Sequence, residues 1–389
     1  MPARRPPRPS TRRDARPKPA PGARRKVAAA VAVAVAVGLI LGVSALAGRV
    51  ARDRDRPRRL RDRAEAATRA GDWPTALDSW RALDRLGGGD ARSCLAEARA
   101  ALALDRGADA GRALLRATEA DPTAVEAWRG RLDRLRVLDR PFEAARVGFD
   151  ALGTVAPGGR RAILSSLTLA LLAELPDDQA RDRLDRWIAA DPDDLDARAA
   201  RLARVAANPR PGDPDRASRI AELSRLLDRD PGHVPTREAL TVALADDGDP
   251  GRGRAVLGAW PPDSRDARFD RLRARWDLDY DARPDRAASG YRRALVDLPH
   301  DWKAHYGLAR ALRAVGRDAE ARGEADAVSR LRERLDPAAL GPRLAADLAR
   351  LDDPRAPADL AALCAGAGLA RLADAWAREA RPDPAAIDR

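Results

Sequence analysis

Apolar residues recur along most of the chain at the three- and four-residue spacing of an α-helix. Residues 125–138 place one such set on a single helical face: Trp128, Leu132, Leu135 and Leu138. Residues 302–315 repeat the spacing, and Gly316 follows as a plausible C-terminal stop. Alternating strand patterns with a polar face are nearly absent. The pattern predicts an all-α protein.

The helical segments recur with a period of about 34 residues. A small residue follows a turn in each unit, at Ala76, Ala110, Ala144, Ala180, Ala287 and Ala321. Asp-Pro or Leu-Pro dipeptides recur at one or two units of the same period, at Pro122, Pro192, Pro231, Pro299 and Pro337. Proline cannot continue a helix, so these dipeptides mark helix ends. About eight helix pairs are predicted between Leu60 and Pro337.

This pattern resembles the tetratricopeptide repeat of bacterial-type proteins. The best matching residues are Ala287, Tyr291, Ala294 and Pro299 in one helix and His305, Leu308, Ala309 and Leu312 in the next. The resemblance implies a right-handed α-solenoid over residues 60–337, in which small residues sit where paired helices cross. Residues 338–389 have a similar pattern and are expected to cover the end of the core as a C-terminal helical cap. The resemblance also implies a concave groove for a protein or peptide partner.

The N-terminal region has a different composition. Residues 1–26 are rich in Pro and Arg and cannot bury a core, so we expect a disordered tail. Residues 27–48 carry no charge and, as a helix, would reach about 33 Å, enough for a bilayer core of roughly 30 Å. Two interpretations remain: a transmembrane anchor followed by a basic linker at 49–59, or an export signal cleaved after Ala47. For an anchor, we expect a single-pass protein of the cell membrane with a cytoplasmic tail and periplasmic repeats.

The net charge of +12 is concentrated at the N-terminus. Residues 1–63 hold 18 Lys and Arg against four acids, a net of +14, so the remaining residues have a net charge of −2. Both signs are interleaved there, as on solvated helix faces. We therefore expect no nucleic-acid partner for the repeats.

Motifs for catalysis or metal binding are missing from the sequence. The three His residues lack a metal-binding spacing, and no nucleophile elbow, phosphate loop or zinc-protease motif occurs. Cys94 and Cys364 are expected to act as small buried apolar residues, although a mutual bridge is compatible with the sequence. We expect neither catalytic residues nor cofactors nor metals, and no enzyme activity.

A membrane-anchored scaffold that binds a protein or peptide in its groove is the leading hypothesis. The candidate groove residues are Arg129, Asp133, Arg136, Trp276, Lys303, Tyr306, Arg310 and Arg313. Each could also be an ordinary solvated or packing residue. The alternatives are an exported structural or assembly protein, after cleavage near Ala47, and an enzyme with a dispersed site. The sequence identifies neither the partner nor the oligomeric state.

Overall fold

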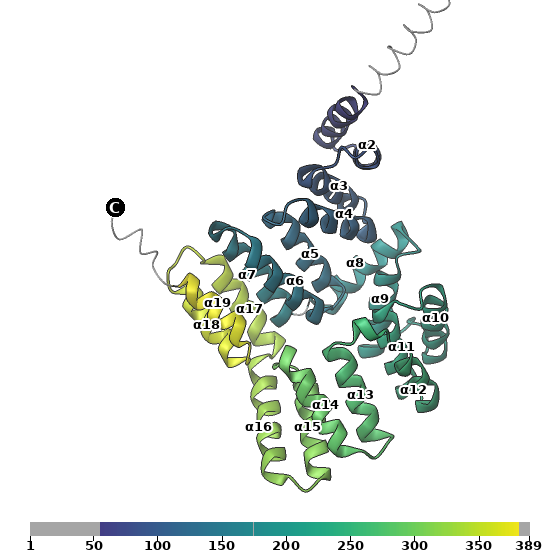
Figure 1. The fold of residues 1–389 in the computed structure, drawn as a ribbon, viewed down its shortest axis with the longest axis vertical. Coiled ribbons are helices and arrows are strands. Elements are labelled where there is room, and N and C mark those ends of the chain that lie inside the picture. Colours follow the sequence, from purple (N-terminus) through teal and green to yellow (C-terminus); the bar gives the residue numbers. More distant parts are fainter. Residues whose placement is uncertain (1–54, 174, 381–389) are drawn as a thin grey trace, which may run out of the picture. The chain divides into compact units, whose positions relative to one another are not determined.

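The computed structural model describes residues 55–173 and 175–380. The chain divides into two compact units, Met1–Leu60 and Arg61–Arg389. The helices from Trp73 onward belong to the second unit. Within the described ranges every regular element is a helix and none is a strand, which confirms the all-α prediction (Figure 1). The predicted tail and the segment 27–48 lie outside these ranges. In the part described, no helix is long and apolar enough to cross a bilayer.

The helices follow one another through short turns. Helical residues run from 55 to 70, and the elements after them are α2 (Trp73–Arg85), α3 (Ala91–Ala103), α4 (Gly107–Ala120), α5 (Val125–Val137), α6 (Pro141–Thr154), α7 (Pro157–Leu172), α8 (Asp177–Ala190), α9 (Leu195–Ala207), α10 (Arg216–Arg229), α11 (Val234–Asp246), α12 (Pro250–Gly258), the 3-10 turn η1 (Pro262–Ser264), α13 (Ala267–Asp279), α14 (Pro284–Asp297), α15 (Trp302–Ala314), α16 (Asp318–Arg334), α17 (Pro337–Ala349), α18 (Ala356–Gly366) and α19 (Ala370–Glu379).

Short polar side chains and proline define many helix starts. Asp90 and Ser93 form a reciprocal capping box at α3, in which each side chain bonds the other residue's backbone N–H. Asp301 caps α15 by accepting from the backbone N–H groups of Lys303 and Ala304. The Pro residues predicted to interrupt helices lie between them, except Pro337, which opens α17.

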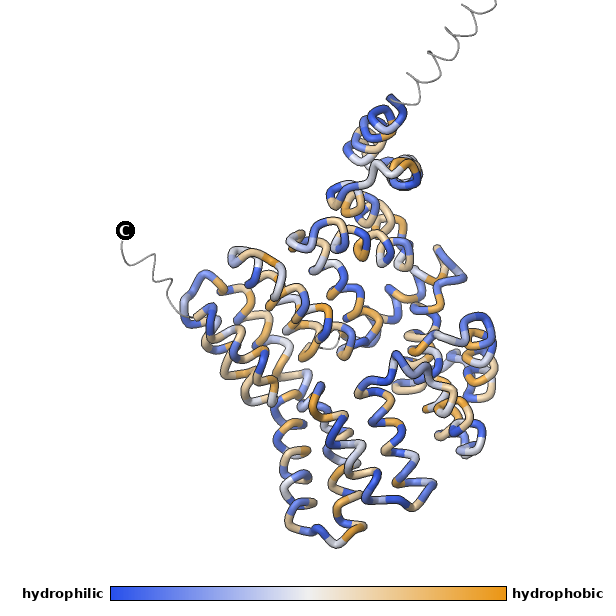
Figure 2. Tube along the Cα trace, in the orientation of Figure 1, coloured by the Kyte–Doolittle hydropathy of each residue, from blue (hydrophilic) through white to orange (hydrophobic). Residues whose placement is uncertain are grey.

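Consecutive helices pack against each other along most of the chain, with the tightest pairs at α3–α4, α13–α14 and α15–α16. Five of the six periodic Ala residues are inaccessible to solvent, and Ala321 is almost so. A methyl group at these positions lets two helices approach closely. Ala144, Ala287 and Ala321 lie in apolar clusters with residues of neighbouring helices, as expected for sites where helices meet. For the other three the role at a helix crossing stays a prediction. Figure 2 shows hydrophobic and hydrophilic residues alternating along the helices, as amphipathic packing requires.

The regular pairing is interrupted at α7. This helix contacts α5 and α6 extensively but makes almost no contact with α8, the partner that a regular repeat would give it. Instead α7 packs against α17 and α19 (Figure 1). One apolar cluster joins Ile163 and Leu167 of α7 to Leu344, Leu360 and Trp376 of the C-terminal helices. The C-terminal region was expected to cover the end of the repeat array, and this role stays a prediction. In the structure its helices contact α7, in the middle of the chain.

Candidate functional site

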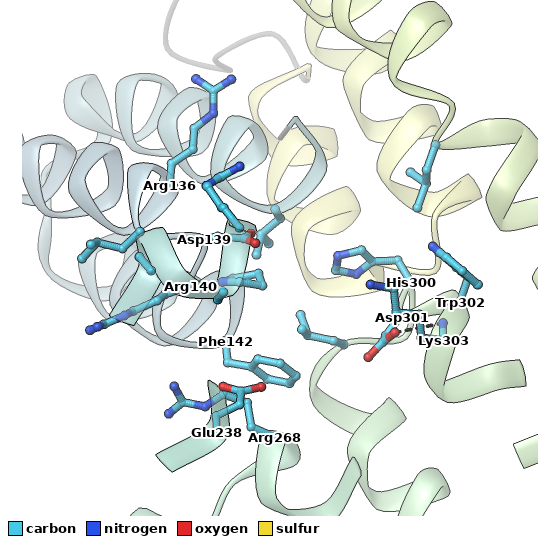
Figure 3. A pocket seen from close by; sticks show the side chains of 18 of the residues that line it. Arg136, Asp139, Arg140, Phe142, Glu238, Arg268, His300, Asp301, Trp302 and Lys303 are labelled. Atoms are coloured by element: carbon cyan, nitrogen blue, oxygen red, sulfur yellow. Dashed lines mark hydrogen bonds between the residues drawn. The ribbon is translucent and has the colours of Figure 1, made fainter. Parts of the chain in front are cut away.

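A cavity of about 1110 Å³ lies among helices that are far apart in the sequence. Its walls come from α5 to α7, α9 to α11, α13 and α15 to α17, together with the turns before α6 and α15. Figure 3 shows Arg140 and Phe142, at the start of α6, facing His300 and Asp301, in the turn before α15. A space of this size accommodates several residues of an extended peptide.

Part of the cavity wall is apolar, with Ala at four of its eight positions. The end of α7 and the inner faces of α9, α10 and α11 supply Ala170, Leu171, Leu172, Ala199, Ala203, Leu223, Ala239 and Val242. Short side chains leave room beside the backbone and offer an apolar contact surface. This wall can hold apolar groups of a ligand without a specific hydrogen-bonding requirement.

Charged residues line the cavity, and several of them pair with carboxylates outside the lining. Eight are basic, namely Arg136, Arg140, Arg204, Arg219, Arg268, Arg271, Lys303 and Arg332, and five are acidic, namely Asp139, Glu238, Asp301, Glu333 and Asp336. Carboxylates outside the lining pair with three of the basic residues: Asp196 with Arg140, Asp177 with Arg204, and Glu143 and Asp266 with Arg268. Lys303 and Arg332 are exposed and form no ion pair within the described ranges, so they are the lining cations that can attract anionic groups.

Ion pairs fix the floor of the cavity around α13. Arg271 donates to Asp301 at 2.7 Å and to Glu238 at 3.1 Å, so it links the N-terminus of α15 to α11. Burial disfavours the charge of Asp301, but Arg271 and the capped N–H groups hold the pKa of that carboxyl below its ordinary value. Arg268 likewise joins Glu143 of α6 at 2.9 Å to Asp266 at 2.7 Å. These side chains therefore act as internal ties between helices.

A second ion cluster surrounds Asp196 of α9. Arg134 and His233 contact its carboxylate at 2.6 Å and 2.9 Å, and Arg140 also pairs with it. Although burial opposes ionisation, the hydrogen bond from His233 and the charges of Arg140 and Arg134 hold the pKa of Asp196 far below its ordinary value. The cluster connects α5, α6, α9 and α11 beside the cavity.

His300 lies in the turn before α15 and lines the cavity. Only 9% of the residue is exposed, and its Nδ1 has no hydrogen-bond partner among the described residues. Burial lowers the pKa of His300, so its imidazole is neutral near pH 7, and the ring interacts with the backbone of Leu171. Figure 3 shows the ring directed toward the space between the two turns.

Trp302 follows as the first residue of α15 and also lines the cavity. Two cations lie close to its indole ring: Lys303 Nζ at 5.8 Å and Arg332 Cζ at 5.3 Å from the ring centroid. Within the described ranges, no ion pair is formed by either Lys303 or Arg332, and both side chains are exposed. The geometry gives one aromatic surface with two accessible positive charges.

The structure brings two of the predicted groove residues, Arg136 and Lys303, to the cavity. Arg136 donates its Nε–H to the Ala173 carbonyl at 2.8 Å. Trp276 does not line a groove: it is fully buried, and its Nε1–H donates to the Pro250 carbonyl at 3.3 Å. The expectation for Trp276 is corrected, because its ring fills the core next to Gly253, where a side chain would collide with it.

The other five predicted residues are exposed outside this cavity. Arg129 and Asp133 lie on α5, whereas Tyr306, Arg310 and Arg313 lie on α15. Arg310 pairs with Asp279 at 3.0 Å and lies over the Tyr306 ring at 5.9 Å. The predicted residues thus do not form one continuous site, and their role in partner binding stays a prediction.

Sequence reasoning missed His300, Trp302 and Arg332. A signal existed in residues 299–303, PHDWK, where an aromatic and the only Lys after residue 26 follow a helix-breaking proline. The structure describes no group of three or more His, Cys, Asp or Glu side chains that could hold a metal ion in residues 55–173 and 175–380. Cys94 and Cys364 are both buried and free, so they do not bridge each other.

Comparisons with known proteins give likenesses of structure alone. No family model matches the chain, and no curated protein matches it. A tetratricopeptide repeat protein from Parabacteroides merdae shares 13% identity, with 66% of this chain and 99% of that chain covered and a TM-score of 0.31. The P58(IPK) TPR domain also shares 13% identity, with 83% of this chain and 92% of that chain covered and a TM-score of 0.30.

The Cut9–Hcn1 assembly of the APC/C shares 14% identity, with 78% of this chain and 55% of that chain covered and a TM-score of 0.37. At such identities and TM-scores, these likenesses say nothing about which residues of this chain bind a partner.

Proposed function

We propose that this protein is an interaction scaffold that holds an extended segment of a partner protein in the cavity. The observation that carries the proposal is the cavity itself, whose lining combines an apolar wall with exposed cations that form no ion pair within the described ranges. Helical repeats commonly present such concave surfaces to peptides. The ion pairs around Arg271 and Asp196 keep the walls in place, so little ordering is needed on binding.

Blocking the cavity tests this function. Ala203 lines the cavity and is exposed, so Ala203→Trp fills space without disturbing the core. The matched control is Ala314→Trp, at an exposed position of α15 outside the lining. An array of short capped peptides of varied composition should bind the full-length protein and the control equally. Binding should be lost with Ala203→Trp, and equal binding by all three proteins would reject the cavity as the site.

We further propose that residues 27–48 anchor the scaffold in the cell membrane, with the repeats on the periplasmic side. The support is the uncharged length of this segment, which suffices for a bilayer core. The full-length protein should stay in the membrane pellet after a carbonate wash, and its intact N-terminus should be detected by mass spectrometry. A mature protein that begins at Gly48 would replace the anchor with cleaved export.

A further inference from the structure

We infer that the cavity recognises an acidic peptide segment, whose side-chain carboxylates bind between Lys303 and Arg332 while a backbone N–H donates to His300 Nδ1. This inference rests on the proposed function and adds the chemistry of the partner. It depends on three features of the lining: the accessible cations, the unpartnered imidazole nitrogen and the apolar surface beside them.

The accessible cations specify the charge of the ligand. Arg268 and Arg271 are held by carboxylates of the protein, so they are already neutralised. Lys303 Nζ and Arg332 Cζ instead lie 5.8 Å and 5.3 Å from the centroid of the Trp302 ring, and neither residue forms an ion pair in the part of the chain that the structure describes. A carboxylate next to the indole can therefore accept charge-assisted hydrogen bonds from both.

The unpartnered Nδ1 of His300 indicates that the ligand supplies a hydrogen-bond donor at this position. A buried polar atom without a partner is unfavourable, so a ligand that satisfies it gains affinity. Burial lowers the pKa of His300, so the imidazole is neutral and one of its two nitrogens is an acceptor. In the tautomer protonated at Nε2, this acceptor is the unpartnered Nδ1. A peptide N–H is a suitable donor, and an acidic residue carries this donor and a carboxylate together.

The spread of cations along the lining also favours a ligand with several acidic side chains over one with a single terminal carboxylate. Arg136 and Arg219 lie elsewhere in the same lining. Each donates to a backbone carbonyl, and Asp133 and Asp215 are their neighbouring charges. One terminal carboxylate cannot reach all of these cations, whereas several acidic side chains along an extended segment can. The protein's own N-terminal region is excluded as the occupant by charge, since residues 1–63 have a net charge of +14.

Two capped peptides test the inference on the full-length protein. The first repeats Glu-Ser-Leu and the second repeats Gln-Ser-Leu, and both have blocked ends, so that only side chains can supply carboxylates. The Glu peptide should bind about tenfold more tightly or better, and added salt should reduce the difference. If the two peptides bind with equal affinity and Ala203→Trp abolishes the binding of both, the acidic preference is wrong while the proposed function stands. Failure of Ala203→Trp to affect either peptide would reject both.

Variants assign the contacts. Lys303→Gln combined with Arg332→Gln should reduce Glu-peptide affinity about tenfold and leave the Gln peptide unchanged. Arg322→Gln, at an exposed position of α16 outside the lining, is the matched control and should change neither affinity. His300→Leu should weaken both peptides, because both offer backbone N–H groups. If it weakens neither in a protein with wild-type helicity, His300 is not the acceptor.

Lysine labelling locates the bound peptide. The sequence contains only Lys18, Lys26 and Lys303, so mass spectrometry can follow each amine after labelling. Bound Glu peptide should protect Lys303 and leave Lys18 and Lys26 reactive. Protection of Lys18 and Lys26 alone would place the peptide on the basic N-terminal region and overturn the inference.

Discussion

The indole Nε1–H of Trp376 donates a hydrogen bond of 2.9 Å to the hydroxyl of Thr168, 208 residues earlier in the chain. Both residues have no solvent exposure. Arg161 adds a second contact between the same helices, to the carboxylate of Glu379 at 3.2 Å. The C-terminal helices are thus held on α7 by specific polar contacts as well as by the shared apolar cluster.

Thr168→Val should destabilise this docking by about 1–3 kcal/mol, because it leaves the buried Trp376 N–H without an acceptor. Chemical denaturation measures the loss, and hydrogen exchange should locate it in α7 and in α17 to α19. Ser165→Ala is the matched control on α7, since its hydroxyl bonds only the Arg161 carbonyl of the same helix. If Thr168→Val leaves exchange in the C-terminal helices unchanged, the contact does not hold them.

Ala321→Leu should open the pair α15–α16. Ala321 is 1% exposed within a cluster that includes Ala304 and Leu308, so a larger side chain has no room. Overpacking of this kind costs about 1–3 kcal/mol. Protease or exchange should reach residues 300–337, while residues 90–155 stay protected. Loss of protection in both regions at once would show that the repeats unfold as one unit.

Substitution of two exposed Arg residues of α15 should have little effect on stability, in contrast to Ala321→Leu. Arg310→Ala and Arg313→Ala should change the free energy of unfolding by no more than about 0.5 kcal/mol, because both side chains lie at the surface. Denaturation curves of the two variants provide the measurement. A larger loss for either would mean that this face of α15 is buried in the native protein.

The helix-pair pattern was predictable because it depends on local spacing. Residues such as Ala144 and Ala321 repeat at fixed intervals, and a residue that packs between paired helices meets partners close in the sequence. Trp276 was placed wrongly because helical periodicity alone does not tell an outward aromatic from one that fills a gap beside a glycine.

The contact between α7 and α19 could not be predicted in this way. It joins residues more than 200 positions apart, and nothing in the sequence around Thr168 differs from an ordinary apolar helix. The cavity shares this property, since His300 and Arg136 come together only after the intervening helices are packed. Its chemistry therefore emerged from the structure and not from a motif.

Gly307→Ala should destabilise the packing of α14 on α15. A Cβ atom at Gly307 would lie 2.3 Å from the nearest ring atom of Tyr291, which is itself 5% exposed and cannot move into solvent. We expect a loss of about 1–3 kcal/mol by thermal or chemical unfolding, despite the higher helix propensity of Ala. Gly323→Ala in α16 is the control, since its Cβ meets nothing within 4 Å and the substitution should be neutral or stabilising. Equal effects of the two would reject the close approach.

Two His residues near the start of α15, His300 and His305, should affect stability with opposite dependence on pH. His305 contacts Glu324 Oε2 through Nδ1 at 2.6 Å and the Pro299 carbonyl through Nε2 at 2.9 Å, an arrangement that suits the doubly protonated ring. Burial opposes the charge, but these hydrogen bonds raise the pKa of His305 above its ordinary value. The resulting stability is fully present below about pH 6.5 and is lost as the pH rises through the raised pKa.

His305→Gln should therefore lower the free energy of unfolding more at about pH 6 than at about pH 9, as measured by urea denaturation. His300 should behave in the opposite way. Burial lowers its pKa, so the unfolded chain binds the proton more readily and the native state loses stability as the solution is acidified below about pH 6.5. Replacing His300 with Gln should remove that acid sensitivity. His300, in the turn before α15, and His305, in α15, lie five positions apart. A general effect of pH on the fold could not give the two substitutions opposite pH dependences of stability. If both dependences have the same sign, one of the two contacts is assigned wrongly.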